Sequence, residues 1–301
     1  MNMESTNGIS TKNILNLTKP KESRTALLES NTPHAFQKLR QDYWTWHFDE
    51  SLSEAARLLL STELGWEAMP ALTTPPVGEV ISPLGYALGH EDEKVQEAAL
   101  QALNATVHIP AGIACIGEER APLEVDEFRI RVYPVTNAQY QRFVQDTGHA
   151  PPQDWTDGRY PESRGDHPVV WVTCEDAEAY AGYVGGRLPT FQEWQYAARG
   201  LDDRHFPWGY EIDKPRCNTA ELGAGTTTPV VAFRDGVSPF GCYDMVGNVW
   251  EWTDTTYDDA GNFRVACGGA WYYNHDYSTC TSYDFFSNGY AEFVIGFRIV
   301  Q

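Results

Sequence analysis

The stretch from Val107 to Gln301 restricts the fold most, because its short apolar segments are broken repeatedly by Gly, Pro, Asn and Asp. Such short apolar segments predict short strands joined by ordered loops. The clearest strand covers residues 128–133, where the side chains alternate in polarity. Its two faces would carry Phe128, Ile130 and Val132 on one side and Arg129, Arg131 and Tyr133 on the other.

Three helices are predicted among these strands, each by a Thr followed three residues later by a side-chain acceptor that can satisfy the first amides of a helix. A glycine stands where each helix would end. The starting pairs are Thr136 with Gln139, Thr173 with Asp176 (the looser match) and Thr190 with Glu193, and the terminating glycines are Gly148, Gly185 and Gly200. Residues 106–301 are therefore predicted to form an α+β domain.

The N-terminal part has a different composition. Residues 1–34 are rich in Ser, Thr, Asn and Lys, too polar to offset the entropy of ordering, so a flexible tail is expected. Residues 35–105 show helical periodicity, with two helices expected between 35 and 60 and a third from Asp92 to Leu103. The third resembles one helix of a HEAT repeat, although a single copy is weak support for a repeat array. We expect a small helical segment that couples to a partner.

The net charge restricts the partners. The chain has 22 basic and 42 acidic residues, a formal net charge of -20, and so negative a surface repels nucleic-acid phosphates and anionic lipid headgroups. The first thirty residues lack the apolar core of a secretory signal, and no run of eighteen apolar residues could cross a membrane. We expect a cytoplasmic protein without nucleic-acid or membrane partners, whose charge favours solubility.

Six cysteines stand at irregular spacings without a C-x-x-C pair. A chain of 301 residues can bury a core without disulfides. Reduced, structural cysteines are therefore expected first, with a disulfide or a reactive thiol as the alternatives. The six are Cys115, Cys174, Cys217, Cys242, Cys267 and Cys280.

Seven motifs follow one another in an order known from a single family. They are IPAG at 109–112, YPVTNAQYQRFV at 133–144, HPVVWVTCEDAEAYAGYVGGRLPTFQEWQYAARG at 167–200, PWG at 207–209, FGCYDMVGNVWEW at 240–252, GGAW at 268–271 and GFRIV at 296–300. Together they resemble the formylglycine-generating-enzyme, or sulfatase-modifying-factor, superfamily. The resemblance implies a C-type-lectin-like fold: two antiparallel sheets, a few helices, and N- and C-terminal strands that lie together.

Bulky side chains in these motifs are expected to anchor the core of a loop-rich domain. Arg187, just before the third capped helix, is expected to be a buried hydrogen-bonding residue rather than a catalytic group. The expected anchors are Trp194, Trp208, Trp250, Trp252 and Trp271.

The residues that carry the family's chemistry are missing. The resemblance implies two cysteines after the Gly-Gly motif, five residues apart, which bind copper as thiolates. Counted from Gly268 and Gly269, these positions hold Tyr273 and Ser278, and Cys280 is a lone thiol two residues further on. Iron-dependent relatives need an H-x3-H-x-E triad, which the eight histidines do not form. We expect neither copper nor iron, and no catalytic residue.

A calcium site is compatible with the sequence. The resemblance implies a structural Ca²⁺ site in the stretch DMVGNVWE, with Asp244 and Glu251 binding through their carboxylates and Gly247 and Val249 through their carbonyls. Such hard oxygen ligands suit calcium. The alternative is that both carboxylates cap loops without a metal.

The window 272–294 is the candidate ligand-binding surface. Of its 23 residues, eight are Tyr or Phe and eight more are Ser, Thr, Asn or Gly. This mixture is typical of antibody paratopes, where Tyr gives rigid contact area and small polar residues give adaptable hydrogen bonds. The predicted contact residues are Tyr272, Tyr273, Asn274, Tyr277, Tyr283, Asp284, Phe285, Phe286, Tyr290 and Phe293.

The window also resembles the variable segment of the variable proteins of diversity-generating retroelements. Asn codons randomised at their adenines reach every residue type in the window except that of Glu292. The first hypothesis is therefore a non-catalytic protein that binds a protein ligand through this surface. A drifted structural domain that packs these rings inside, and an oxidoreductase with an unrecognised metal-dependent site, remain the alternatives.

Overall fold

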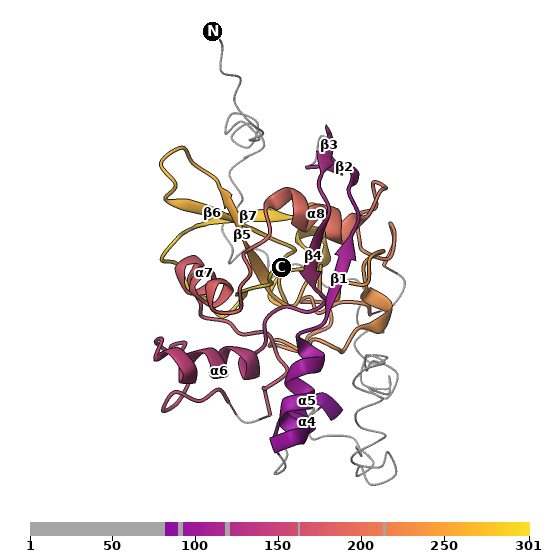
Figure 1. Cartoon of the computed structure of the whole chain (residues 1–301). Coiled ribbons are helices and arrows are strands. Elements are labelled where there is room, and N and C mark those ends of the chain that lie inside the picture. The colour runs from indigo at the N-terminus through magenta and orange to yellow at the C-terminus, as the bar shows by residue number, and fades with distance from the viewer. Residues whose placement is uncertain (1–81, 90–92, 118–120, 162, 213–214) are drawn as a thin grey trace.

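The computed structural model describes residues 82–89, 93–117, 121–161, 163–212 and 215–301 (Figure 1). The predicted tail and the two helices expected between 35 and 60 lie outside these residues. The elements in chain order are helices α4 (Pro83–Leu88) and α5 (Glu93–Leu103), strands β1 (Thr106–Ile109), β2 (Gly112–Ile116), β3 (Ala121–Val125) and β4 (Phe128–Arg131), helices α6 (Asn137–Thr147), α7 (Cys174–Tyr183), α8 (Phe191–Arg199) and the 3-10 helix η4 (Arg234–Gly236), strands β5 (Trp250–Thr256) and β6 (Phe263–Cys267), the 3-10 helix η5 (His275–Tyr277), and strands β7 (Tyr283–Ser287) and β8 (Ile295–Phe297).

The three capped helices are confirmed, as is the helix α5. At α7, the looser of the predicted pairs forms a complete capping box: the Thr173 amide donates to Asp176 Oδ2 over 2.9 Å, and the Asp176 amide donates to Thr173 Oγ1 over 3.0 Å. At the end of α6, Gly148 adopts φ 72°, the left-handed conformation in which glycine costs least. Local side-chain chemistry therefore sets these helix boundaries.

The strands form three sheets. The pairs β1–β4 and β2–β3 are antiparallel (Figure 1). The third sheet has the order β7-β6-β5-β8. Its β5–β8 pair is parallel, so the expectation of two antiparallel sheets was wrong. The reason is that residues 288–294 carry the chain from one sheet edge to the other, and β7 and β8 then run in the same direction. The predicted meeting of the domain's ends is confirmed, because the Arg131 amide donates to the Ile299 carbonyl over 2.8 Å.

The four-stranded sheet separates two apolar clusters. Helix α8 contributes Trp194 to the first cluster, together with Ile109 and Ile130 from the β1–β4 pair. Helices α6 and α7 pack in the second cluster, which contains Trp250 and Trp252. Of the five predicted anchors, Trp194, Trp250 and Trp252 are fully buried, whereas Trp208 and Trp271 are half-buried.

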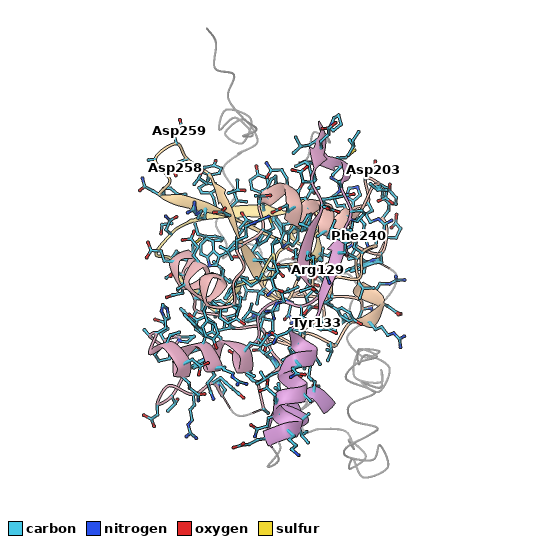
Figure 2. The ribbon with its side chains drawn as sticks, viewed as in Figure 1. Arg129, Tyr133, Asp203, Phe240, Asp258 and Asp259 are labelled. Atoms are coloured by element: carbon cyan, nitrogen blue, oxygen red, sulfur yellow. The ribbon has the colours of Figure 1, made fainter. Side chains whose placement is uncertain are left out.

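The described end of the helical segment packs against this domain. Leu84 of α4 and Val95 of α5 share an apolar cluster with Tyr133 and Val230. Tyr133 lies where the helices meet the strands (Figure 2), and its ring is 5.0 Å from that of Tyr243. Helices α4 and α5 therefore belong to the same packed body as the strands. Within the described residues, no helix is long and apolar enough to cross a bilayer.

The alternation predicted for residues 128–133 holds for Phe128 and Ile130 and then fails. Arg131 and Tyr133 are buried, and Val132 is half-buried. The strand β4 ends at Arg131. There the Arg131 guanidinium donates to Asn104 and the Val132 amide donates to the Ala105 carbonyl, both directly after α5. Packing against the helical segment therefore overrides the period of the strand.

Candidate functional site

The loop after β6 holds the two positions at which the resemblance implied cysteines. Tyr273 is buried, with its ring edge-on to Trp250 at 5.8 Å. Ser278 is fully buried, and its Oγ has no hydrogen-bond partner. Neither side chain is a thiolate, and both are buried.

The thiols of the chain are poor candidates for redox chemistry. All six cysteines are free, and five are buried. Burial raises the pKa of Cys174 to about 12 and raises the pKa values of Cys217, Cys242, Cys267 and Cys280 as well. The Cys280 thiol lies 3.6 Å from the Ala198 carbonyl. Because the thiolate is the form that binds metal and reacts, these five positions favour a packing role.

Part of the 272–294 window gathers in one aromatic cluster at the edge of the second core. The Phe293 ring lies 5.5 Å from Tyr272 and 5.6 Å from Trp271. These three side chains are half-buried, so each offers part of a ring to solvent while the rest packs on the core. Such rings are rigid and partly desolvated, the properties of residues that contribute most to protein interfaces.

Trp171 completes this cluster, and it was not among the predicted contact residues. Its ring lies 6.0 Å from Phe293, and its amide donates to the Glu292 carbonyl over 3.0 Å. Its φ of 60° is rare for a bulky residue and costs about 1–3 kcal/mol, which the surrounding fold must supply. The only sequence signal was its place within the HPVVWVT motif. We call Trp171, Trp271, Tyr272 and Phe293 the aromatic patch.

The remaining predicted contact residues lie around the patch or on the other side of the sheet. Tyr277 and Tyr290 are half-buried against the second core, and Tyr290 donates to Glu292 Oε2 over 2.7 Å. Asn274 precedes η5 and accepts the Tyr277 amide through its carbonyl. The structure thus brings together only part of the predicted surface.

Strand β7 separates the others. Tyr283 and Phe285 pack against the first core, where Phe285 stacks on Tyr257 at 3.6 Å. Phe286 points the opposite way and is buried in the second core. Asp284 accepts the Phe285 amide over 2.9 Å. The period of two in a strand therefore divides this part of the window between two faces.

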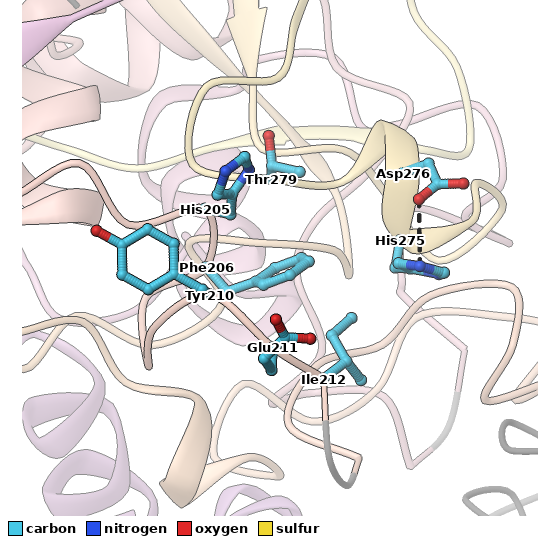
Figure 3. A pocket seen from close by; sticks show the side chains of 8 residues that line it. All are labelled: His205, Phe206, Tyr210, Glu211, Ile212, His275, Asp276 and Thr279. Atoms are coloured by element: carbon cyan, nitrogen blue, oxygen red, sulfur yellow. Dashed lines mark ion pairs between the residues drawn. The ribbon is translucent and has the colours of Figure 1, made fainter.

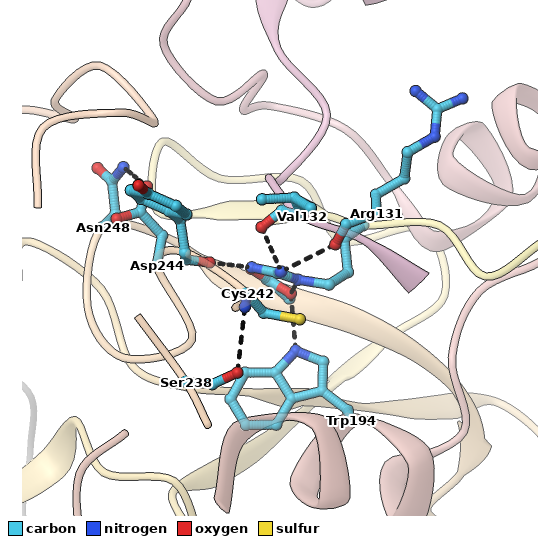
Figure 4. A network of polar contacts seen from close by, with 10 residues as sticks. Arg131, Val132, Trp194, Ser238, Cys242, Asp244 and Asn248 are labelled. Carbon is cyan, nitrogen blue, oxygen red and sulfur yellow. Dashed lines mark hydrogen bonds and ion pairs between the residues drawn. The ribbon is translucent and has the colours of Figure 1, made fainter. Parts of the chain in front are cut away.

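A network of buried polar contacts includes Trp194, which donates to an ion pair in the core (Figure 4). Arg298 donates from Nε to Glu251 Oε2 and from Nη2 to Glu251 Oε1, both over 2.6 Å. Trp194 Nε1 also donates to Glu251 Oε2, over 2.7 Å. The guanidinium further donates to the carbonyls of Val132 and Tyr243. Both charged side chains are fully buried and neutralise each other.

The hydrogen bonds of Glu251 and Asp244 show which of these two implied calcium ligands fits a metal ion. Both oxygens of Glu251 already accept from Arg298, so this carboxylate does not fit a calcium ligand. Asp244 does fit, because its buried Oδ1 has no hydrogen-bond partner, while its Oδ2 accepts from Asn248 over 2.9 Å. Burial raises the pKa of Asp244 to about 7. A cation beside Oδ1 would offset the free-energy cost of burying the charged carboxylate.

The chain is similar in sequence both to enzymes and to an inactive homologue. Residues 91–301 match the sulfatase-modifying factor enzyme 1-like domain. The formylglycine-generating enzyme of Mus musculus is 33% identical, in an alignment that covers 50% of this chain and 58% of that protein. The inactive C-alpha-formylglycine-generating enzyme 2 of Mus musculus is 31% identical and matches 56% of this chain and 74% of its own length. The chain spans little more than half the length of the formylglycine-generating enzymes of Mus musculus and Bos taurus.

Solved structures show the same fold. PvdO from Pseudomonas aeruginosa superposes with a TM-score of 0.55 and 24% identity, covering 65% of this chain and 93% of that one. Treponema denticola variable protein 1 superposes with a TM-score of 0.51 and 19% identity, covering 65% of this chain and 94% of that one. At these identities the likeness establishes the architecture alone.

Proposed function

We propose that this chain, which belongs to the sulfatase-modifying factor enzyme 1-like family, is a non-catalytic recognition protein that binds a protein ligand through the aromatic patch. The observation that carries the proposal is the cluster of four half-buried rings around Phe293, held in place by a strained backbone at Trp171. Rigid rings lose little entropy on binding, so they suit a broad adhesive contact.

The loop that would carry oxidative chemistry supports the same proposal. Tyr273 and Ser278 occupy the two metal-binding positions, and both are packed inside. Cys280 is buried, with a raised pKa. A soft metal ion requires accessible thiolates. The loop therefore provides structural support for the patch rather than ligands for copper.

The test is alanine substitution in the patch. Peptides would be selected from a random phage-displayed library on the immobilised protein, and their affinities measured by calorimetry. We expect Trp171→Ala and Phe293→Ala each to weaken binding by about 2 kcal/mol, roughly thirtyfold. The matched control is Ile113→Ala, since Ile113 is an apolar side chain exposed on β2, and it should change affinity less than twofold. Peptides that bind the patch variants as tightly as wild type would contradict the proposal.

Diversification of the window is a further part of the proposal. Its support is compositional, because all residues from 272 to 294 except Glu292 are reachable from randomised Asn codons. The test is sequencing of the DNA around the gene. A near-identical repeat with adenines at the variable positions, beside a reverse-transcriptase gene, is expected, and related strains should differ mainly within this window.

Oxidoreductase activity is the second candidate, favoured by the 33% identity to a formylglycine-generating enzyme. Metal analysis of the purified protein separates the two candidates. Stoichiometric copper or iron, together with oxygen-dependent loss of thiol from a cysteine peptide, would support the enzyme. Their absence is the result we expect.

We propose that a structural calcium ion binds at Asp244, with the carbonyls of Gly247 and Val249, and that Glu251 takes no part. We expect millimolar CaCl2 to raise the melting temperature by several degrees, because a ligand at a hundred times its Kd adds about 2.7 kcal/mol. Asp244→Asn should remove most of the shift, and MgCl2 at the same concentration should give little. A full shift in Asp244→Asn would contradict the assignment.

The calcium effect should depend on pH. The folded-state pKa of Asp244, about 7, lies above its ordinary value of 3.8. Folding therefore takes up a proton between these values, so the metal-free protein loses stability as pH rises through this window. Calcium competes with that proton. Its stabilising effect should be larger at pH 8 than at pH 6, as thermal unfolding at both pH values will show.

A further inference from the structure

A pocket of about 550 Å³ lies beside the window, between the loop that follows α8 and the helix η5 (Figure 3). Two hydrogen bonds hold its walls. The Cys280 amide donates to the His205 carbonyl over 2.8 Å, and Trp208 Nε1 donates to the Glu211 carbonyl over 2.9 Å. The pocket shares η5 with the window, and neither the patch nor the calcium proposal uses it.

Aromatic rings form one side of the pocket. Phe206 points toward its middle in Figure 3 and stacks on Trp208, with ring centroids 5.2 Å apart and planes within 4°. Tyr210 also lines the pocket and lies edge-on to His205 at 5.8 Å. The faces of such rings carry partial negative charge and attract organic cations.

Carboxylates also line the pocket. Glu211 and Asp276 are exposed at the pocket. His275 lies between two acids, with Nδ1 2.8 Å from Glu221 Oε1 and Nε2 3.2 Å from Asp276 Oδ1. The hydrogen bond with Glu221 raises the pKa of His275.

Among the described residues, Glu211 and Asp276 line the pocket and Glu221 lies buried against His275, so carboxylates outnumber the nearby cations, His275 when protonated and Arg216, which lies over the Trp208 ring at 5.9 Å. The nearby Arg204 is neutralised by Asp202, to which it donates from Nε over 2.6 Å. The buried Glu221 accepts from both the amide and the ring of His275, and these hydrogen bonds outweigh burial and lower its pKa, so it stays charged beside the histidine. Rings and acids in one pocket are the features that bind a guanidinium or ammonium group.

We propose that this pocket binds the basic side chain, Arg or Lys, of the protein ligand. The inference rests on the proposed function and names the chemistry of the partner. A net charge of -20 favours a basic partner and steers its approach. The pocket then selects one cationic side chain beside the less selective contact of the patch.

The probe is the tripeptide Gly-Arg-Gly, with Gly-citrulline-Gly as a neutral isostere and agmatine as a free guanidinium compound. Binding is measured by NMR titration of the full chain, following the ring signals of His205 and His275. We expect the citrulline peptide to bind at least tenfold more weakly than the arginine peptide. Agmatine should bind no more tightly than the arginine peptide. Glu211→Gln and Asp276→Asn should each weaken the arginine peptide about threefold, because each removes one partly screened charge.

Glu124→Gln is the matched control, since it removes an exposed carboxylate on β3 and should leave binding unchanged. Equal binding of arginine and citrulline peptides, binding of agmatine alone, or equal effects of all three substitutions would overturn the inference. The patch variants leave this pocket intact. A failed patch test with successful peptide binding would therefore reject the proposed surface alone, and the reverse would reject this inference alone.

Discussion

Arg298→Met should lower the free energy of unfolding by about 3–5 kcal/mol, because it leaves the Glu251 carboxylate charged and buried without its partner. The structure gives Glu251 no solvent exposure, and both of its oxygens accept from Arg298. Three strand-adjacent carbonyls, those of Arg131, Val132 and Tyr243, would lose a donor as well. Urea denaturation followed by tryptophan fluorescence measures the loss.

Two further variants distinguish a buried ion pair from general damage. The double variant Arg298→Met, Glu251→Met removes both charges, so it should be more stable than Arg298→Met alone. Arg142→Met breaks an ion pair with Glu97 in which both side chains are half-exposed, and it should cost less than about 1 kcal/mol. Equal losses in Arg142→Met and Arg298→Met would show that burial is not the cause.

The elements that the sequence predicts best are those set by local chemistry. The capping pairs at Thr136, Thr173 and Thr190 predict where three helices begin, because each pair satisfies amides within four residues of itself. The order of the seven motifs predicts the fold. Neither signal depends on which segments meet in space.

The features that sequence reasoning misses depend on distant contacts. Arg187 was expected to be a buried hydrogen-bonding residue, but it is half-exposed and pairs with Glu193. Arg298 has that role because β8 lies beside β5, which carries Glu251. The strain at Trp171 and the burial of Arg131 likewise arise from segments that are far away in the sequence.

The composition of residues 272–294 predicted a binding surface, but it predicted the position of only some of its side chains. Composition cannot tell which rings of a strand face outward, and β7 sends Phe285 and Phe286 to opposite sides. The loop residues Tyr272 and Phe293 do meet, because Trp271 and Trp171 hold them against the second core. Periodicity gives no information in a loop, so only coordinates could define the patch.

Gly269→Ala should cost about 2–5 kcal/mol, the sum of about 1–2 for left-handed strain and 1–3 for overpacking. Gly269 has φ 80°, and a Cβ there would lie 2.1 Å from Ser278 Oγ and 2.7 Å from the Ser278 Cα. The close approach of these two residues closes the loop that carries Trp271 and Tyr272. The substitution should therefore weaken ligand binding along with stability, as urea denaturation and calorimetry with the selected peptides will show.

Gly148→Ala is the matched control, because Gly148 has φ 72° with nothing within 4 Å of an added Cβ. It should cost about 1–2 kcal/mol from strain alone and leave binding unchanged. Ser278→Gly in the Gly269→Ala background removes the two nearest side-chain atoms but not the Cα, so it should restore only part of the loss. If both glycine substitutions lower the free energy of unfolding equally, contact with Ser278 does not hold the loop. Gly269 would then be required only for its left-handed backbone conformation.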